Sequence, residues 1–282
     1  MKLGLHQITA NECDPLTLVD LAAEVGCEEV CLFTHIPRAA LPGDAAPTLF
    51  PVVTRPLVAR LRERLDAAGV GVGNVEFFPV TAAGDAGLYR ESFEIAAAIG
   101  ARRAVTHIHD AEDARAVDSL GRLGALAAEH GLRLGLEFMG LTPACASIER
   151  AAWFVEQVGV AQVGIGVDAL HLVRTGGRPA DVARIPSALF TYAQICDAAG
   201  LQATPDYLHE ALERRLPGDG DFPLAAFVAA LPEGVAVDVE VPSAARIAAG
   251  QPALGHARTA VARARRLLTG IGAARKDHSA GR

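Results

Sequence analysis

A barrel of eight parallel strands surrounded by helices is the fold that the sequence predicts. Eight short apolar runs alternate with longer segments in which apolar residues recur at helical spacing. Several of these helical segments stop at a glycine, which is a common residue just past a helix C-terminus. Eight strand–helix units of ordinary length fill about 270 residues, and the chain has 282. Together these observations favour an α/β fold with a single domain, the (β/α)8 or TIM barrel.

Each of the eight apolar runs is expected to form one strand. The runs are short and mostly rich in Val, Leu and Ile, as buried parallel strands usually are. Glycines such as Gly73 and Gly166 lie inside two of them, and small residues inside a barrel leave room for large neighbours in the same layer. The runs span residues 2–6, 29–33, 71–77, 103–108, 132–137, 163–168, 189–195 and 235–240.

The segments between these runs are expected to form helices. Their apolar residues recur every three or four positions, and the rhythm of helix, glycine and strand repeats along the chain. The clearest helical segments are residues 16–25, 52–68, 89–99, 114–130 and 147–158, which are followed by Gly26, Gly69, Gly100, Gly131 and Gly159.

An open, doubly wound sheet is the alternative architecture. Such a sheet usually has fewer strands and a glycine-rich first turn, but the first turn here, residues 6–9 (HQIT), has no GxGxxG pattern. No linker is evident, so we predict one TIM barrel domain over residues 1–272 and a flexible polar tail over residues 273–282. Residues 197–221, after the seventh strand, form the longest stretch that we expect to be irregular, and loops of this length are usually functional or disordered.

The overall composition excludes several classes of function. The net charge is -7 and the pI is about 5.7, which disfavours nucleic acid as a partner because phosphate binding needs a basic face. No run of about 18 apolar residues predicts a membrane span, and the N-terminus does not resemble a signal peptide. The five cysteines are an odd number without CxxC spacing, as expected of reduced thiols in a cytoplasmic protein. Whether the chain forms a homodimer or a homotetramer stays open.

Oxygen-bearing side chains lie at the C-terminal ends of four predicted strands. In a barrel of parallel strands that end carries the chemistry, so the four side chains should converge. Carboxylate and amide oxygens suit hard cations such as Mg²⁺ or Mn²⁺. Any one of these residues could be an ordinary polar residue that faces water at a strand end. This alternative explains four such residues on four strands less well. The sequence therefore predicts one divalent ion bound by Glu137, Asp168, Gln194 and Glu240.

Further residues near the same strand ends are candidates to bind a substrate. His171 and His107 follow the sixth and fourth strands and could bind a hydroxyl group or relay a proton. Glu76, at the end of the third strand, is either a second acid near the substrate or an ion-pair partner at the rim. Arg214 and Arg215 precede a Pro-Gly turn, and one of the two guanidinium groups could hold a carboxylate, a phosphate or sugar hydroxyls at the barrel mouth.

Three other reactive or aromatic residues are better explained by structure. Trp153 lies among apolar residues on a helical face, which favours packing. Cys196 has no paired His–Asp arrangement nearby in the sequence, so we interpret it as a packing thiol. His6, at the end of the first strand, is slightly better explained as structural than as functional.

The order and spacing of five short motifs resemble the xylose isomerase-like TIM barrel superfamily, and within it the sugar phosphate isomerase/epimerase group. The resemblance covers nearly the whole chain, and it is specific at the superfamily level although each motif alone is weak. The motifs are 136–139 (LEFM), 168–171 (DALH), 194–197 (QICD), 216–220 (LPGDG) and 239–243 (VEVPS).

The resemblance implies a metal site and a set of substrate contacts. In that family a Glu, an Asp, a His or Gln, and a Glu bind Mn²⁺, Mg²⁺, Co²⁺ or Zn²⁺, and these positions match the four residues named above. Gln194 departs from the many sugar epimerases that have His there, although hydroxypyruvate isomerase-like members also use Gln. The family's substrate-binding histidine matches His171, and its arginine before the Pro-Gly turn matches Arg214 better than Arg215. Ketose epimerases carry an acidic residue soon after the first metal Glu, whereas residues 138–144 contain none.

The reactions of this superfamily are isomerisation, epimerisation, dehydration of inosose or dehydroshikimate, and endonucleolytic cleavage. The endonuclease branch needs three zinc ions and many histidines. This chain lacks that density of histidines, and its pI is about 5.7, so we set this branch aside. The expected substrate is a small polyhydroxy carbonyl compound, from which Glu137 or Glu240 would remove the proton beside the carbonyl to give an enediolate. Our first expectation is an isomerase or epimerase. A dehydratase is the second, and a metal-binding subunit without catalytic activity is the third.

Overall fold

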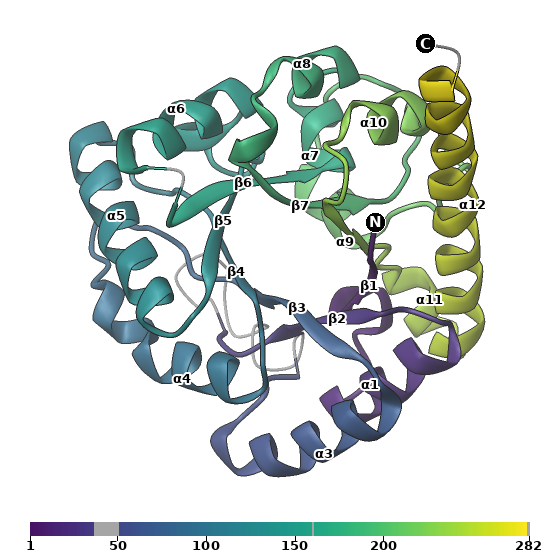
Figure 1. Ribbon diagram of the computed structural model, residues 1–282, viewed down its shortest axis with the longest axis horizontal. Helices are drawn as coiled ribbons and strands as arrows, with labels where there is room; N and C mark the ends of the chain where they lie inside the picture. Colours follow the sequence, from purple (N-terminus) through teal and green to yellow (C-terminus); the bar gives the residue numbers. More distant parts are fainter. Residues whose placement is uncertain (37–50, 160, 281–282) are drawn as a thin grey trace.

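The computed structural model describes residues 1–36, 51–159 and 161–280, and its strands close into a barrel of eight parallel strands in sequence order. Figure 1 shows the barrel from one end, with the helices in a ring around it. The predicted fold class is therefore confirmed. The strands are β1 (Leu3–His6), β2 (Glu29–Phe33), β3 (Gly71–Glu76), β4 (Arg103–Thr106), β5 (Arg133–Glu137), β6 (Val163–Asp168), β7 (Phe190–Ile195) and β8 (Ala236–Val239).

The main helices pack their apolar sides on the outside of the barrel, and the predicted helical segments correspond to the first five of them. The second begins later than expected, at Val58, because residues 55–57 around Pro56 form a 3-10 turn. The helices are α1 (Pro15–Glu24), α3 (Val58–Ala68), α4 (Arg90–Ala98), α5 (Asp113–Glu129), α6 (Ile148–Val158), α10 (Leu224–Ala230) and α12 (Ala253–Ala280).

Four short helices are not among the segments that the sequence marks most clearly as helical. Helices α7 (Ala169–Arg174) and α8 (Pro179–Arg184) follow β6, and α11 (Ala244–Ala248) follows β8. The stretch 197–221 is not wholly irregular, because it contains α9 (Tyr207–Leu212), whose first turn is capped by the Asp206 side chain. Helices of five or six residues are too short to give a recognisable apolar period, which is why the sequence did not reveal them.

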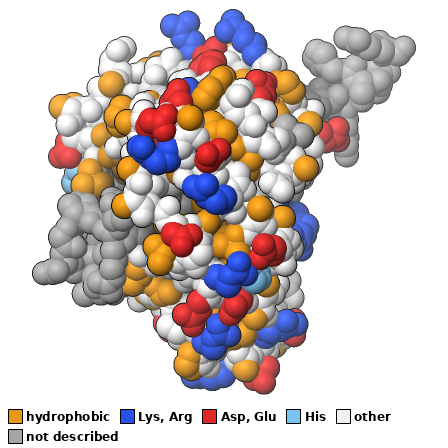
Figure 2. Space-filling model, turned by 90° about the vertical axis from the view of Figure 1, so that its left-hand side faces the viewer, with side chains coloured by type: hydrophobic (Ala, Val, Ile, Leu, Met, Phe, Trp, Pro, Cys, Tyr) orange, Lys and Arg blue, Asp and Glu red, His pale blue; other side chains and the backbone are white. Residues whose placement is uncertain are grey.

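The C-terminal helix α12 continues through Ala280 in the structure, past residue 273, where the sequence predicts the start of a tail. The division into a barrel domain and a flexible tail stays a prediction. Among the helices of the described residues, none combines the length and the apolar character that a membrane span requires. On the face shown in Figure 2, acidic and basic side chains are intermixed and do not gather by sign.

Glycines in the barrel strands make room for one large side chain. A Cβ on Gly166 would overlap the ring of Tyr192, and a Cβ on Gly135 would lie 2.5 Å from Tyr192 Cε1. Tyr192 is completely buried, and its hydroxyl reaches the C-terminal end of β5. The small residues of β5 and β6 therefore admit a tyrosine that contacts the candidate site.

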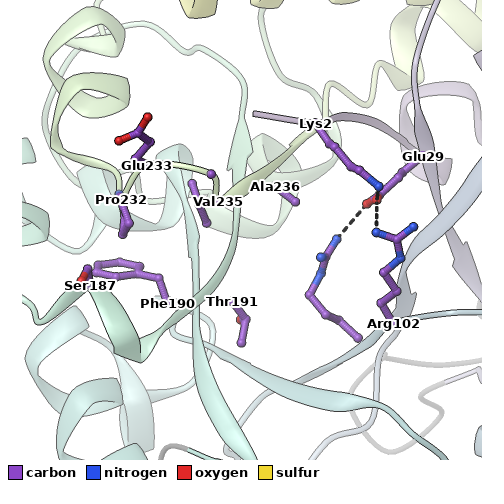
Figure 3. Close-up of a pocket in the computed structure, with 12 residues that line it drawn as sticks. Lys2, Glu29, Arg102, Ser187, Phe190, Thr191, Pro232, Glu233, Val235 and Ala236 are labelled. Atoms are coloured by element: carbon purple, nitrogen blue, oxygen red, sulfur yellow. Dashed lines mark hydrogen bonds and ion pairs between the residues drawn. The ribbon is translucent and has the colours of Figure 1, made fainter. Parts of the chain in front are cut away.

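The end of the barrel where the strands begin holds a buried polar network and a pocket of about 390 Å³. Figure 3 shows this pocket, in which Lys2 and Arg102 each approach Glu29 to 3.1 Å. Arg103 also binds Glu29 and Asn74, and Asn74 donates a hydrogen bond to Asp238. Lys2, Glu29, Arg102 and Arg103 lie at strand starts, the end of a barrel that serves stability more often than catalysis. Asn74 and Asp238 extend this network into the barrel.

Candidate metal centre

Three carboxylates meet at the C-terminal end of the barrel, and an amide side chain belongs to the residue paired with one of them on the next strand. Glu137 and Asp168 are the last residues of β5 and β6, and Glu240 follows the last residue of β8. Oxygen atoms of these three carboxylates lie within 4.8 Å of one another. Gln194 on β7 pairs in register with Asp168 on β6. All four residues are buried, with at most 6% of their surface exposed.

Two oxygens of this cluster are buried without a hydrogen-bond partner. They are Gln194 Oε1 and Glu240 Oε2. A buried acceptor without a partner is costly, and a cation among these oxygens would satisfy both. The donor set is entirely oxygen, which suits a hard divalent ion. The residues present therefore fit a divalent metal ion.

Arg214 places a positive charge against the carboxylates of this cluster. Its Nη1 lies 2.8 Å from Asp168 Oδ2 and its Nη2 lies 3.0 Å from Glu240 Oε1. Burial alone would raise the pKa of Asp168, but Arg214 and His171 hold it below its usual value. The pKa of Glu240 is raised well above its usual value, because burial and the neighbouring acids outweigh Arg214 and His6.

Asp168 also ends its strand by capping the next helix. Its Oδ1 accepts hydrogen bonds from the backbone N–H groups of Leu170, at 2.6 Å, and His171, at 3.1 Å. An aspartate is a preferred residue at the first position of a helix, where its oxygen satisfies free N–H groups. The cap fixes the direction of α7 and thereby places His171 beside the carboxylates.

Glu137 is surrounded by three side chains that can donate hydrogen bonds. Tyr192 donates to Glu137 Oε2 at 3.1 Å. The Nε2 atoms of His107 and His171 lie 3.5 Å and 3.4 Å from its two oxygens. Burial, followed by the charges of Asp168 and Glu76, raises the pKa of Glu137 well above its usual value. Both predicted substrate-binding histidines thus lie against a candidate metal ligand.

Glu76 belongs to a second buried group at the same end of the barrel. Its Oε1 lies 2.7 Å from His6 Nε2 and accepts a hydrogen bond from the Cys31 thiol at 3.2 Å. Burial opposes a charge on His6, but the charges of Glu76, Glu240 and Asp238 raise the pKa of His6 to about 9. His6 therefore pairs with the carboxylate of Glu76 at the same end of the barrel as the cluster.

The two arginines of the long loop have different surroundings. Arg214 is buried between two candidate ligands, whereas Arg215 is exposed and donates to the Asp219 carbonyl. Arg214 also lies 3.6 Å from the Cys196 thiol, so this cysteine packs against the site. In the structure the Arg214 guanidinium binds two of the carboxylates, and its contact with a substrate stays a prediction.

Nothing in the sequence indicates that Tyr192 and Tyr207 belong to the site. Tyr192 lies within a strand whose alternating pattern is shared by ordinary core residues. Tyr207 lies in the stretch that was expected to be irregular, and its hydroxyl is 2.7 Å from His171 Nδ1. Only the spatial arrangement of β7, α7 and α9 brings these hydroxyl groups to Glu137 and His171.

The fold has counterparts among known proteins. A xylose isomerase domain protein from Alicyclobacillus acidocaldarius superposes with a TM-score of 0.75, at 22% identity, over 96% of this chain and 99% of that one. The IOLI protein with a bound zinc atom gives a TM-score of 0.78 at 18% identity, over 96% and 99% of the two chains. A D-psicose 3-epimerase gives 0.69 at 14% identity, over 95% and 99%. At these identities the likeness shows the fold alone.

Relatives in sequence place the chain in a family. A 3-dehydroshikimate dehydratase of Pseudomonas aeruginosa is 32% identical over 119 residues, which is 42% of this chain. The match spans only 18% of that relative's length. The xylose isomerase-like TIM barrel family matches residues 19–267. The chain therefore belongs to the xylose isomerase-like TIM barrel family.

Proposed function

We propose that the protein is a divalent-metal-dependent isomerase or epimerase of a sugar or keto-polyol. The observation that supports this proposal best is the cluster of Glu137, Asp168 and Glu240, with oxygens within 4.8 Å of one another. The unpartnered oxygens of Gln194 and Glu240 add to it. Glu137, Asp168, Gln194 and Glu240 would hold the ion, for which we favour Mn²⁺ or Mg²⁺.

The chain's own residues supply the groups that such a reaction needs. When bound, the ion would act as a Lewis acid toward the oxygens of the substrate. Glu137 or Glu240 would remove the proton on the carbon beside the carbonyl. These two acids come from β5 and β8, which are separated by β6 and β7, so they reach the site from different sides. Proton removal by one acid and delivery by the other would epimerise, whereas a single acid would isomerise.

The remaining polar side chains would orient the substrate. His107 and His171 lie against Glu137, and Glu76 lies in the neighbouring group with His6. Arg214, which pairs with Asp168 and Glu240, would also contact the substrate. The proposed substrate is a small polyhydroxy carbonyl compound, and a cytoplasmic location is part of the proposal.

A dehydratase is the second candidate. It is favoured by the sequence match to a 3-dehydroshikimate dehydratase over 42% of the chain. The same proton removal, followed by loss of a β-hydroxyl group instead of reprotonation, would give dehydration. The two reactions would therefore share proton removal at this site and would differ only in the step that follows it.

Metal analysis together with a solvent-exchange assay tests the proposal. The purified full chain should bind one Mn²⁺, and Glu240→Gln and Asp168→Asn should each lose it. Glu210→Gln is the matched control, because Glu210 pairs with Arg174 outside the cluster. In D₂O with Mn²⁺, a panel of keto-sugars, inososes and dehydroshikimate should include a compound that gains deuterium beside its carbonyl. Full metal occupancy in both site variants, or turnover without such exchange, would contradict the proposal.

A further inference from the structure

Tyr207 joins three segments at the mouth of the barrel. It is the first residue of α9, after β7, and its ring lies parallel to that of His171 after β6, with an angle of 10° between them. Its hydroxyl is 2.7 Å from His171 Nδ1 and accepts a hydrogen bond from the Gly140 N–H at 3.1 Å, after β5. Gly140 permits this approach, because a Cβ there would lie 2.6 Å from the tyrosine ring.

The directions of these hydrogen bonds can be assigned. A backbone N–H only donates, so the bond from Gly140 uses a lone pair of the Tyr207 oxygen. The hydroxyl proton then needs an acceptor, and among the described residues its only acceptor within hydrogen-bond distance is His171 Nδ1. Nδ1 must then be the ring nitrogen without a proton, and a neutral imidazole in this state carries its proton on Nε2.

The other side of the imidazole ring is compatible with this assignment. His171 Nε2 lies 3.4 Å from Glu137 Oε1. A carboxylate oxygen without a proton accepts hydrogen bonds, so a proton on Nε2 suits this neighbour whenever Glu137 is ionised. The assignment itself rests on Tyr207 and Gly140.

We propose that Tyr207 is a positioning residue that fixes His171 as the Nε2–H tautomer, so that His171 presents a hydrogen-bond donor to a substrate oxygen beside Glu137. The role of that donor in turnover rests on the proposed function. A fixed N–H aimed at an oxygen stabilises the negative charge that develops there during proton removal. His171 then acts as a donor, and the task of removing the proton is left to the carboxylates.

Nitrogen NMR of the metal-free full chain tests the tautomer directly. The His171 ring nitrogens, assigned with His171→Gln, should show the shift pattern of an Nε2–H imidazole. Tyr207→Phe keeps the ring but removes the hydroxyl, and should move both nitrogens toward the average of the two tautomers. Gly140→Ala should do the same, because it displaces the tyrosine ring.

Tyr89→Phe is the matched control for this experiment. Its hydroxyl is also buried and donates to the Pro79 carbonyl at 2.8 Å, far from His171 in the sequence and outside the site. This variant should leave the His171 signals unchanged. An Nδ1–H pattern in the unmodified protein, or an unchanged Nε2–H pattern in Tyr207→Phe, would overturn the inference.

The tautomer and the proposed function can fail separately. The NMR measurement needs neither metal nor substrate, so it stands if no turnover is found. Once a substrate is known, Tyr207→Phe should lower kcat about tenfold or more, because a positioned hydrogen-bond donor to a developing negative charge contributes on the order of a hundredfold. Its KM and metal content should stay unchanged. A normal kcat together with the averaged NMR pattern would refute the role in turnover but not the tautomer.

Discussion

The guanidinium of Arg214 lies between Asp168 and Glu240 and binds one oxygen of each, at 2.8 Å and 3.0 Å. All three groups are buried. A single arginine therefore neutralises part of the charge of a site whose other acidic member is Glu137. The two carboxylates that it joins belong to β6 and to the end of β8, so the ion pair also ties together strands that are separated by β7.

Replacing Arg214 with alanine should destabilise the metal-free protein strongly. Removing one partner of a buried ion pair leaves uncompensated charge and typically costs about 3–5 kcal/mol. A divalent ion should restore most of this loss, since it would supply positive charge at the same oxygens, so we expect the variant to retain metal and to lose turnover. Denaturant unfolding in EDTA and in excess Mn²⁺, with metal analysis, measures both effects.

Arg215→Ala is the control for this prediction, since Arg215 is the exposed neighbour in the same loop. It should change stability by less than about 0.5 kcal/mol in either buffer. Loss of metal from Arg214→Ala would show that the arginine orients the ligands and does more than balance their charge.

Much of the fold could be predicted because its signals are local. A buried parallel strand is a short apolar run, and a helix that ends at glycine has a regular period, so both are visible without tertiary information. Asp168 could be placed at a strand end, but not as the cap of α7. Helices α7, α8, α9 and α11 have only five or six residues each, and this is too short for a period.

The neighbours of the site could not be predicted because they depend on packing. Nothing in the sequence distinguishes Tyr192 from a core tyrosine, and its role follows from the glycines of two other strands. The meeting of His6, Cys31 and Glu76 requires the closure of β1, β2 and β3 side by side. Arg214 could be placed near the barrel mouth, but its binding to the candidate ligands follows from the path of the loop after β7.

Gly166→Ala should destabilise the protein by forcing Tyr192 away from Glu137. The added methyl group would overlap the tyrosine ring, and overpacking of this kind typically costs about 1–3 kcal/mol. The variant should also weaken metal binding, because Tyr192 donates to a candidate ligand. Combining Gly166→Ala with Tyr192→Leu should cost less than the sum of the two single changes, as measured by denaturant unfolding.

Gly121→Ala tests whether the loss is specific to the barrel interior. Gly121 lies in α5, and the nearest atom to an added Cβ is 3.8 Å away. Alanine favours the helix over glycine by up to about 1 kcal/mol, so this variant should be neutral or more stable. Equal destabilisation by both substitutions would argue against the overlap with Tyr192.

The five cysteines should differ sharply in reactivity in the folded protein. Burial raises the pKa of Cys27 and of Cys145 to about 12 and the pKa values of Cys31 and Cys196 well above the usual range. Cys13 is the one that is not fully buried, although burial also raises its pKa. Because the thiolate is the reactive form, a disulfide reagent at about pH 8 should modify Cys13 alone.

Counting the modified thiols checks this prediction. The folded protein should give one and Cys13→Ser none, whereas all five should react in guanidinium chloride. Cys145→Ser should still give one in the folded state. A second thiol that reacts as fast as the first would contradict the burial of these side chains.

The stability of the protein should depend on His109 at acidic pH. Burial, together with the charge of His107, lowers the pKa of His109 to about 4 from the usual 6.5. The folded state thus binds a proton less tightly than the unfolded state does. The neutral ring's contribution to stability is fully present above about pH 6.5, and it is lost as the pH falls from 6.5 toward 4. A shift of this size corresponds to about 3 kcal/mol at most, and the partial exposure of His109 reduces the expected loss to about 1–2 kcal/mol.

His109→Gln should therefore flatten the pH dependence of stability between pH 6.5 and 4. Glutamine does not titrate in this range, so the free energy of unfolding of the variant should fall about 1–2 kcal/mol less than that of the unmodified protein. His209→Gln is the control, because it makes the same substitution at an exposed histidine on α9. Urea unfolding at half-unit pH steps, with EDTA present so that metal loss does not contribute, gives the comparison. Identical slopes of unfolding free energy against pH for the unmodified protein and His109→Gln would contradict the prediction. They would show that protonation of His109 does not destabilise the fold, and that water reaches its ring more readily than the structure shows.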